Sequence, residues 1–238
     1  NRLFVLIPRK SFRTAGPLRP EPGLNRGKEI RPQARCSIAG DERGHCAPMI
    51  TIPNESFESM LVTHPVLLLS SRQGRYNTLS PLVWYMPVSG DPPMLALSLK
   101  PSSMSYHYIR ESGDFILAVP DDKLLKAIHF CGVHSGRDVD KISHLNLTTA
   151  RGRAVSPLVV TNCLANIECR VRDIYSSGNR PLITGEVLSI IVNPNFYDRE
   201  WLPQARLVYY LGGNRYRVGN ETVDMSDVRP GYVPPESI

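Results

Sequence analysis

The sequence lacks most of the short motifs that would assign a chemistry directly. Its 238 residues contain five cysteines but no C-x-x-C pair, so a thiol redox motif or a zinc ribbon is not indicated. The glycine-rich phosphate loops G-x-G-x-x-G and G-x-x-x-x-G-K-[ST] are also absent. No apolar run approaches the roughly 18 residues that a membrane-spanning helix needs, and we therefore expect no integral membrane segment.

The cysteines give no support for a disulfide framework. Cys163 just before and Cys169 within one expected strand lie about 20 Å apart in extended chain at roughly 3.3 Å per residue, which is too far for a bridge. Unpaired thiols are typical of reducing compartments, so we expect a cytoplasmic protein. His129, Cys131 and His134 have the donor atoms of a zinc site but lack a fourth ligand nearby. The preferred interpretation is a helix end packed in the core, without metal.

Positive charge is concentrated near the amino terminus. Residues 1–48 hold ten Lys or Arg and four Asp or Glu, and this difference equals the net charge of +6 of the whole chain. Residues 49–238 are therefore neutral overall, and the charge gives no reason to expect a nucleic-acid-binding domain.

The first 48 residues read as a leader and the rest as one domain. Residues 1–48 are rich in proline and show no sustained period of 2 or 3.6, which indicates a disordered or loosely attached segment. An organelle transit peptide is one interpretation, since the segment is rich in Arg and poor in acids. The other is that the ordered protein begins near Met49, and that the leader is an over-long start or foreign to the native chain.

From Thr63 the sequence alternates short apolar runs with turn signals. The runs predict strands over residues 65–71, 76–85, 94–99, 115–119, 165–175, 182–192 and 207–211. Helices are expected over 102–112, closed by Gly113, and from Asp121 or Asp122 to Cys131. Closely spaced strands with hairpin turns favour an antiparallel barrel, because parallel pairs need crossover helices. We therefore predict a mainly-β fold, an antiparallel barrel with two or three short flanking helices.

Four sequence blocks carry a resemblance to a known family. They are NTLSPLVW from Asn77, ALSLKPSSMSY from Ala96, HFCG with SGRDVDK from His129, and ANIEC with GEV and LGGNRY from Ala165. In this order and spacing, residues 65–217 resemble the flavin reductase-like, FMN-binding split-barrel family, close to its flavoredoxin branch. The resemblance implies a Greek-key split β-barrel that forms a homodimer, with FMN in a groove at the dimer interface.

The second block suits a phosphate group. Residues 101–105 offer Pro and Ser at an expected helix start, with Lys100 just upstream, and such a start supplies backbone N–H and hydroxyl donors to an anion. The alternative is that Ser102 only caps the helix and that Ser105 is a solvated helix residue. The cofactor-binding candidates in this block are Ser98, Lys100, Ser102, Ser103 and Ser105.

The third block contains a second turn that suits an anion. Gly136 allows close backbone approach, and Arg137 offers a planar fork of donors. The resemblance places this loop at the flavin site, which adds Ser135, Gly136, Arg137 and Lys141 to the candidates. Alternatively, Asp138, Asp140 and Lys141 cap and balance a short helix.

The first block implies contacts with the flavin ring. In the family this strand lies along the isoalloxazine, which makes Asn77, Thr78, Ser80 and Pro81 candidates. Many relatives have Thr at Pro81 and Ser at Val83, so fewer side-chain hydroxyls are expected to face the flavin here. Trp84 is expected in the core rather than as a stacking partner.

The resemblance implies an NAD(P)H-dependent flavin reductase that transfers hydride from nicotinamide C4 to flavin N5 without a catalytic acid or base. The alternatives are a flavoredoxin-like electron carrier that takes electrons from a protein partner, and a flavin-binding module without turnover. Many relatives have Asp-His where Asn179-Arg180 stands. Arg180 is the nicotinamide-site candidate, since its guanidinium group can pair with a dinucleotide phosphate. Pairing with the extra 2′-phosphate would favour NADPH. Otherwise this hairpin indicates that NAD(P)H is not used, or Arg180 is an exposed turn residue.

Overall fold

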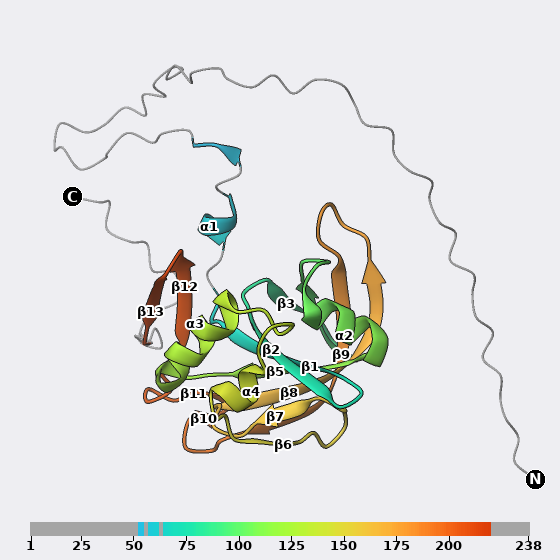
Figure 1. Ribbon diagram of the computed structural model, residues 1–238. Coiled ribbons are helices and arrows are strands. Elements are labelled where there is room, and N and C mark those ends of the chain that lie inside the picture. Colours follow the sequence, from blue (N-terminus) through green and yellow to red (C-terminus); the bar gives the residue numbers. More distant parts are fainter. Residues whose placement is uncertain (1–51, 55–56, 62–63, 220–238) are drawn as a thin grey trace, which may run out of the picture. The chain divides into compact units, whose positions relative to one another are not determined.

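Seven antiparallel strands form the main sheet of the computed structural model, which describes residues 52–54, 57–61 and 64–219. The strand order is β2 (Tyr76–Leu82), β1 (Leu67–Gln73), β5 (Asp114–Val119), β8 (Ala165–Tyr175), β9 (Leu182–Val192), β4 (Pro93–Ser98) and β3 (Tyr85–Gly90). The sheet curls into a split barrel (Figure 1). The predicted mainly-β, Greek-key split barrel is confirmed. The leader predicted for residues 1–48 lies outside the described residues.

Smaller elements surround this sheet. Three two-stranded sheets pair β6 (Thr149–Arg151) with β7 (Leu158–Val160), β10 (Tyr197–Asp198) with β11 (Glu200–Trp201), and β12 (Val208–Gly212) with β13 (Arg215–Val218). The described helices are α1 (Phe57–Leu61), α2 (Met104–Ser112), a 3-10 turn η2 (Asp122–Leu124) that continues into α3 (Leu125–Val133), and α4 (Lys141–His144). Asp140 caps α4 through its Oδ1, which accepts from the backbone N–H groups of Ile142 and Ser143. The predicted short helix after Asp140 is therefore present.

Helix α2 shows how local sequence sets an element's bounds. Ser103 caps its start, because the Ser103 Oγ accepts from the Tyr106 N–H at 3.2 Å. Gly113 ends it with φ of 73°, and the Gly113 N–H donates to the Ile109 carbonyl. The cap is thus Ser103 and not Ser102, the residue considered from the sequence, whereas the predicted end at Gly113 is confirmed.

One predicted strand is two strands in the structure. The strand expected over 76–85 ends at Leu82, and β3 begins at Tyr85. β2 pairs with β1, but β3 pairs with β4 at the opposite edge of the sheet. Because both halves are extended, the sequence pattern does not reveal that the chain changes partners at Val83 and Trp84.

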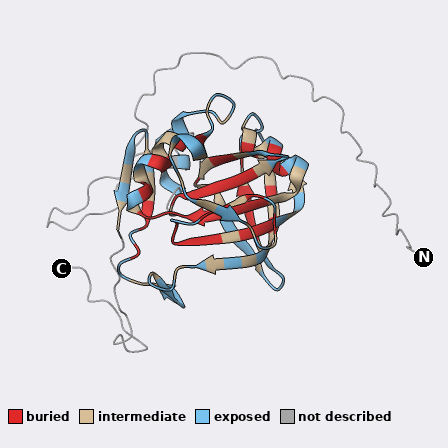
Figure 2. Cartoon of the chain, turned by 60° about the horizontal axis from the view of Figure 1, so that its bottom comes forward, coloured by how far each residue is buried: buried red, intermediate tan, exposed pale blue. Residues whose placement is uncertain are grey.

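The barrel interior is an apolar core. Phe115, Leu69, Leu117 and Ile183 are at most 1% exposed, and Figure 2 shows the buried residues concentrated in the central strands. Glu168 alternates with the apolar residues Ile167 and Cys169 along β8, but its own side chain is fully buried. Its carboxylate accepts the backbone N–H groups of residues 153–155 at 2.6–3.1 Å, so the loop between β6 and β7 covers that face of β8.

The packing of β9 on Phe115 gives a stability prediction. A Cβ at Gly185 would lie 2.7 Å from Phe115 Cζ, and Phe115 has no room to move in the core. We expect Gly185→Ala to lower the free energy of unfolding by about 1–3 kcal/mol, as overpacking does. Gly90→Ala on β3 is the matched control, since nothing lies within 4 Å of its Cβ position. Urea unfolding measures both variants, and equal midpoints would contradict this packing.

Candidate functional site

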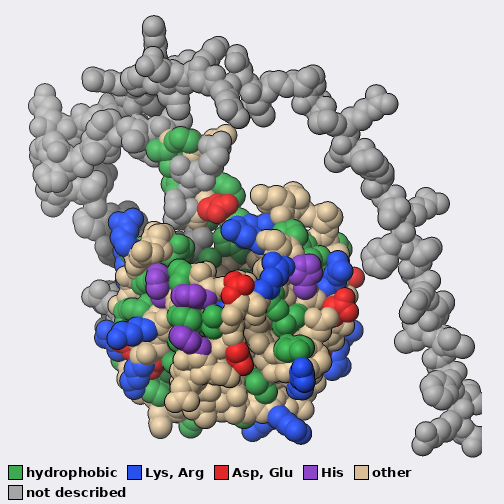
Figure 3. All heavy atoms as spheres, in the orientation of Figure 1, with side chains coloured by type: hydrophobic (Ala, Val, Ile, Leu, Met, Phe, Trp, Pro, Cys, Tyr) green, Lys and Arg blue, Asp and Glu red, His purple; other side chains and the backbone are tan. Residues whose placement is uncertain are grey.

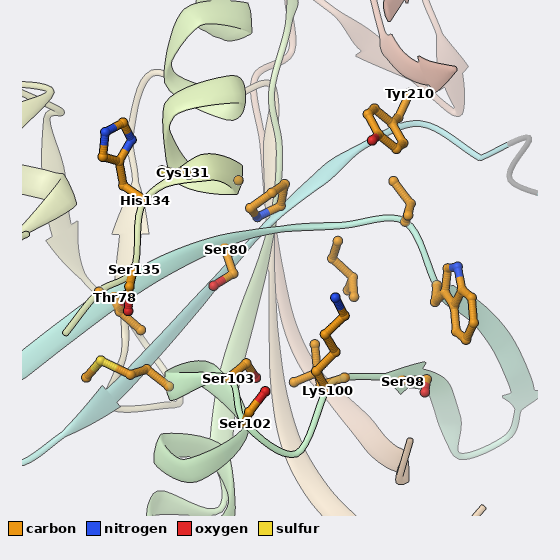
Figure 4. Close-up of a pocket in the computed structure, with 18 of the residues that line it drawn as sticks. Thr78, Ser80, Ser98, Lys100, Ser102, Ser103, Cys131, His134, Ser135 and Tyr210 are labelled. Atoms are coloured by element: carbon orange, nitrogen blue, oxygen red, sulfur yellow. The ribbon is translucent and has the colours of Figure 1, made fainter. Parts of the chain in front are cut away.

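A cavity of about 600 Å³ lies where several segments of the chain meet. Its lining comes from β2 and the turn after it, the segment from the end of β4 to the start of α2, the end of α3 with the following loop, the β8–β9 hairpin, and β12, together with Glu58 of α1 and Lys141 of α4. Figure 4 shows the hydroxyls at the start of α2 on one side and Tyr210 on the other. Segments more than 100 residues apart in the sequence therefore share one site.

Most of the candidate residues predicted from the sequence meet in this cavity. Those that line it are Thr78, Ser80, Pro81, Ser98, Lys100, Ser102, Ser103, Ser135, Gly136, Lys141 and Arg180. The three that do not line it are Asn77, Ser105 and Arg137.

These three side chains have other partners. Asn77 lines a separate surface cavity and donates from Nδ2 to the Arg75 carbonyl at 3.4 Å. The Arg137 Nη2 donates to the Ser102 carbonyl at 3.2 Å, which ties its loop to the segment that leads into α2. Ser105 is fully buried, so the alternative of a solvated helix residue is wrong. Its Oγ lies 2.8 Å from the Oγ of Ser80, and it supports the cavity wall from behind.

The start of α2 offers donors to an anion. The Ser102 and Ser103 side chains line the cavity, and the amino group of Lys100 points into it (Figure 4). Ser103 Oγ accepts from the Tyr106 N–H, which leaves its own hydroxyl hydrogen to donate elsewhere. This end of the cavity can thus bind a phosphate through hydroxyls, an ammonium group and the helix start.

Gly136 brings a loop directly against β2. A Cβ at this position would lie 2.4 Å from Thr78 Oγ1 and 3.3 Å from Thr78 Cβ. The close approach predicted from the glycine is therefore present in the structure, toward the wall of β2. It places the Ser135 and Thr78 side chains next to each other at one end of the cavity (Figure 4).

Lys141 is a buried cation at the cavity wall. It is 4% exposed, and its Nζ donates to the carbonyls of Leu79 at 2.9 Å and Cys131 at 2.7 Å. Among the described residues no carboxylate lies within 4.0 Å of it. Burial lowers the pKa of Lys141, while the Cys131 thiol acts in the opposite direction. A buried ammonium without a counter-charge is costly, so an anion in the cavity would relieve this cost.

Cys131 places a thiol at this wall that stays protonated at neutral pH. Burial raises the pKa of Cys131 to about 11, with Lys141 lowering it by a smaller amount. Cys131 is 2% exposed and has no role as a nucleophile.

Trp84 and Arg180 form the opposite wall. The Arg180 guanidinium carbon lies 4.2 Å from the centroid of the Trp84 ring, and both side chains line the cavity. The expectation that Trp84 belongs to the core is wrong, because the indole lines the cavity and is only half buried. Arg180 has no carboxylate within 4.0 Å in the described part of the chain.

Sequence reasoning missed several lining residues. Gly132 and His134 come from the end of α3, and Tyr210, Leu211 and Gly212 come from β12. The LGGNRY block was the available signal for β12, but nothing local shows that it reaches this cavity.

The histidines near α3 contact aromatic rings. His134 and His144 stack on Phe130 at centroid distances of 3.9 Å and 4.5 Å, and His129 Nδ1 lies 3.2 Å from the hydroxyl of Tyr216. His side chains gather on the face in Figure 3, where acidic and basic side chains are interspersed. In the part of the chain that the structure describes, no three His, Cys, Asp or Glu side chains are placed to hold a metal ion.

The Ser80–Ser105 contact gives a testable coupling. We expect Ser80→Ala and Ser105→Ala each to lower the unfolding free energy by about 0.5–1.5 kcal/mol, because each removes the same partly buried hydrogen bond. The double variant should lose less than the sum of the two, and a double-mutant cycle measures the difference. Full additivity would show that the two hydroxyls do not interact.

Comparison with known proteins agrees with this fold. None of the described helices has the length and apolar character needed to cross a membrane. An uncharacterized Archaeoglobus fulgidus protein is 33% identical over 115 residues, which cover 48% of this chain and 65% of that protein. The chain therefore spans less than two thirds of this relative. The uncharacterized protein YddH of Escherichia coli K12 is 30% identical over 174 residues, covering 69% of this chain and 92% of YddH.

Flavoredoxin from Methanosarcina acetivorans has the same fold, with a TM-score of 0.66 and 24% identity over 76% of this chain and 97% of that chain. The family model "Flavin reductase like domain" matches residues 59–217, which include every strand of the split barrel and every described residue of the cavity except Glu58. The chain belongs to the flavin reductase-like family.

Proposed function

We propose that this protein binds FMN in the 600 Å³ cavity and works as an NAD(P)H-dependent flavin reductase. The observation that carries the proposal is the buried, acid-free ammonium group of Lys141 in the same cavity as the hydroxyls of α2. The volume is in the range of cofactor sites, which are mostly apolar with a few placed polar groups.

The residues present fit the phosphate of FMN. Ser102 and Ser103 supply hydroxyl donors at the start of α2. Lys100 supplies an exposed ammonium group that can contact the phosphate. Arg137 acts indirectly, because it holds the Ser102 carbonyl and so fixes the loop from which Ser102 projects. Lys141 supplies a second positive charge from inside the wall.

The residues present also fit a flat ring. Pro81, Val83, Leu99 and Tyr210 supply apolar walls that exclude water, and Trp84 with Arg180 closes the far side. When bound, FMN supplies the ring that takes up hydride. The chain then has to bind and orient the two reactants, and no side chain of the cavity is required as an acid or base.

We propose a homodimer for the working protein. Leu188, Ile190 and Val192 are exposed in the second half of β9, where β4 no longer pairs with the strand. An unpaired strand edge with apolar side chains is a surface that a two-fold partner can cover.

A flavoredoxin-like electron carrier is the second candidate function, and Arg180 is the observation that favours it. The guanidinium stands in the hairpin beside the cavity, where the family resemblance leads us to expect an imidazole. In that case a redox partner protein replaces NAD(P)H as the electron donor. An absorbance spectrum of the purified protein, followed by anaerobic addition of NADH or NADPH, separates the candidates: bleaching of the flavin bands supports the reductase.

The phosphate contact is tested with FMN and riboflavin. We expect Ser102→Ala to weaken FMN by about 1.5–3 kcal/mol, the value of a lost charge-assisted hydrogen bond, and to leave riboflavin unchanged. Ser189→Ala on β9, away from the cavity, is the control. Fluorescence titration measures both flavins. Equal weakening of the two would place Ser102 away from the phosphate.

Arg180 is tested by steady-state kinetics with both nucleotides. We expect Arg180→His to raise KM for NADPH roughly 10-fold, about 1.4 kcal/mol, with a smaller effect on NADH, because the guanidinium pairs with the extra phosphate. Arg75→His is the control, since Arg75 also lies over an aromatic ring but outside the cavity. A protein that holds reducible FMN but oxidises neither nucleotide would overturn the reductase and favour the carrier.

A further inference from the structure

A second cavity adjoins the first. It measures about 250 Å³ and shares Pro81, Val83, Gly132 and Tyr210 with the larger cavity. Two residues of the common wall lie close together, since a Cβ on Gly132 would lie 3.3 Å from Pro81 Cγ. A molecule in this small cavity would therefore sit one side chain away from the contents of the large one.

The walls of the small cavity are apolar. Val66, Ile128 and Val133 line it together with the rings of Tyr210 and Tyr216, and no Lys, Arg, Asp or Glu among the described residues does so. A phosphate, a carboxylate or a dinucleotide would lose its hydration here without gaining a counter-charge. The volume is below the usual range for drug-sized ligands, so the cavity suits one ring and not a fused system.

One end of the small cavity is polar. His129 Nδ1 and the Tyr216 hydroxyl lie 3.2 Å apart, and both side chains line the cavity. If the hydroxyl donates to the imidazole, the phenolic oxygen still accepts a hydrogen bond. If the imidazole donates, the hydroxyl is left to donate to a ligand. Burial, with a smaller contribution from Tyr210, raises the pKa of Tyr216, so its hydroxyl stays protonated at neutral pH.

We propose that the small cavity binds a neutral, one-ring aromatic compound that carries a hydroxyl or carbonyl oxygen. The apolar walls take the ring, and the His129–Tyr216 pair takes the oxygen in either hydrogen-bonding sense. Its position beside the large cavity makes it the site of a second reactant. That role rests on the proposed flavin chemistry, whereas binding itself does not.

The probes are p-cresol and p-xylene, which have nearly the same shape but differ in one hydroxyl. Titration calorimetry on the full chain, with and without FMN, measures both affinities. A neutral hydrogen bond predicts that p-cresol binds about 3- to 10-fold more tightly than p-xylene. Tyr216→Phe should remove this preference. Tyr175→Phe, an exposed tyrosine of β8 outside both cavities, should keep it.

A second variant keeps the test informative if Tyr216→Phe does not fold. Val133 is 60% exposed and lines the cavity from outside, so Val133→Phe should fold and weaken both probes together. Equal affinities in the wild type, or a preference that survives in Tyr216→Phe, would overturn the proposal. So would displacement of p-cresol by FMN, or loss of binding as protein concentration rises, because a second copy would then cover the cavity.

The test separates this proposal from the proposed function. A chain that shows the p-cresol preference but binds no FMN keeps the aromatic site and loses the flavin function. A chain that binds FMN but shows no preference keeps the flavin function and loses the aromatic site.

Discussion

The amino group of Lys141 connects the elements that form the large cavity. It belongs to the first turn of α4, and its two hydrogen bonds reach a carbonyl of β2 and a carbonyl of α3. Both carbonyls are shielded from water in the folded protein, and the Lys141 ammonium group donates a hydrogen bond to each of them. The position of the loop that carries Ser135 and Gly136, which lies between α3 and α4, depends on this contact.

The same contact explains why the site suits an anion. Backbone carbonyls hold the Lys141 ammonium group but do not neutralise it, and the described residues supply no carboxylate nearby. An anion bound in the cavity would therefore balance this charge. Glu168 shows the opposite arrangement on β8, where three backbone N–H groups hold a buried carboxylate away from the cavity.

The two cavities also differ in the chemical character of their walls. Hydroxyl groups and Lys100 gather at the start of α2, whereas Pro81, Val83, Gly132 and Tyr210 stand between the large cavity and the small one. The backbone at Gly132 lies close to the ring of Pro81, where a Cβ would meet Cγ at 3.3 Å. The two cavities thus offer different environments next to each other.

The sequence determined the elements whose signals are local. The bounds of β8 and β9 follow from their lengths and the hairpin turn between them, and the end of α2 follows from Gly113, which adopts a positive φ. Most of the candidate residues that the family resemblance identified line the large cavity, since they lie in contiguous blocks.

Only the tertiary structure decided which of these side chains face the cavity and which pack elsewhere. Alternation along β8 could not show that Glu168 is buried, because the loop that covers it is formed by a different part of the chain. Ser102 and Ser105 look alike in sequence, but the helix turns Ser105 toward Ser80 and leaves Ser102 at the cavity. Trp84 faces the cavity because β3 leaves β2 to pair with β4, and strand pairing over such distances depends on the whole sheet.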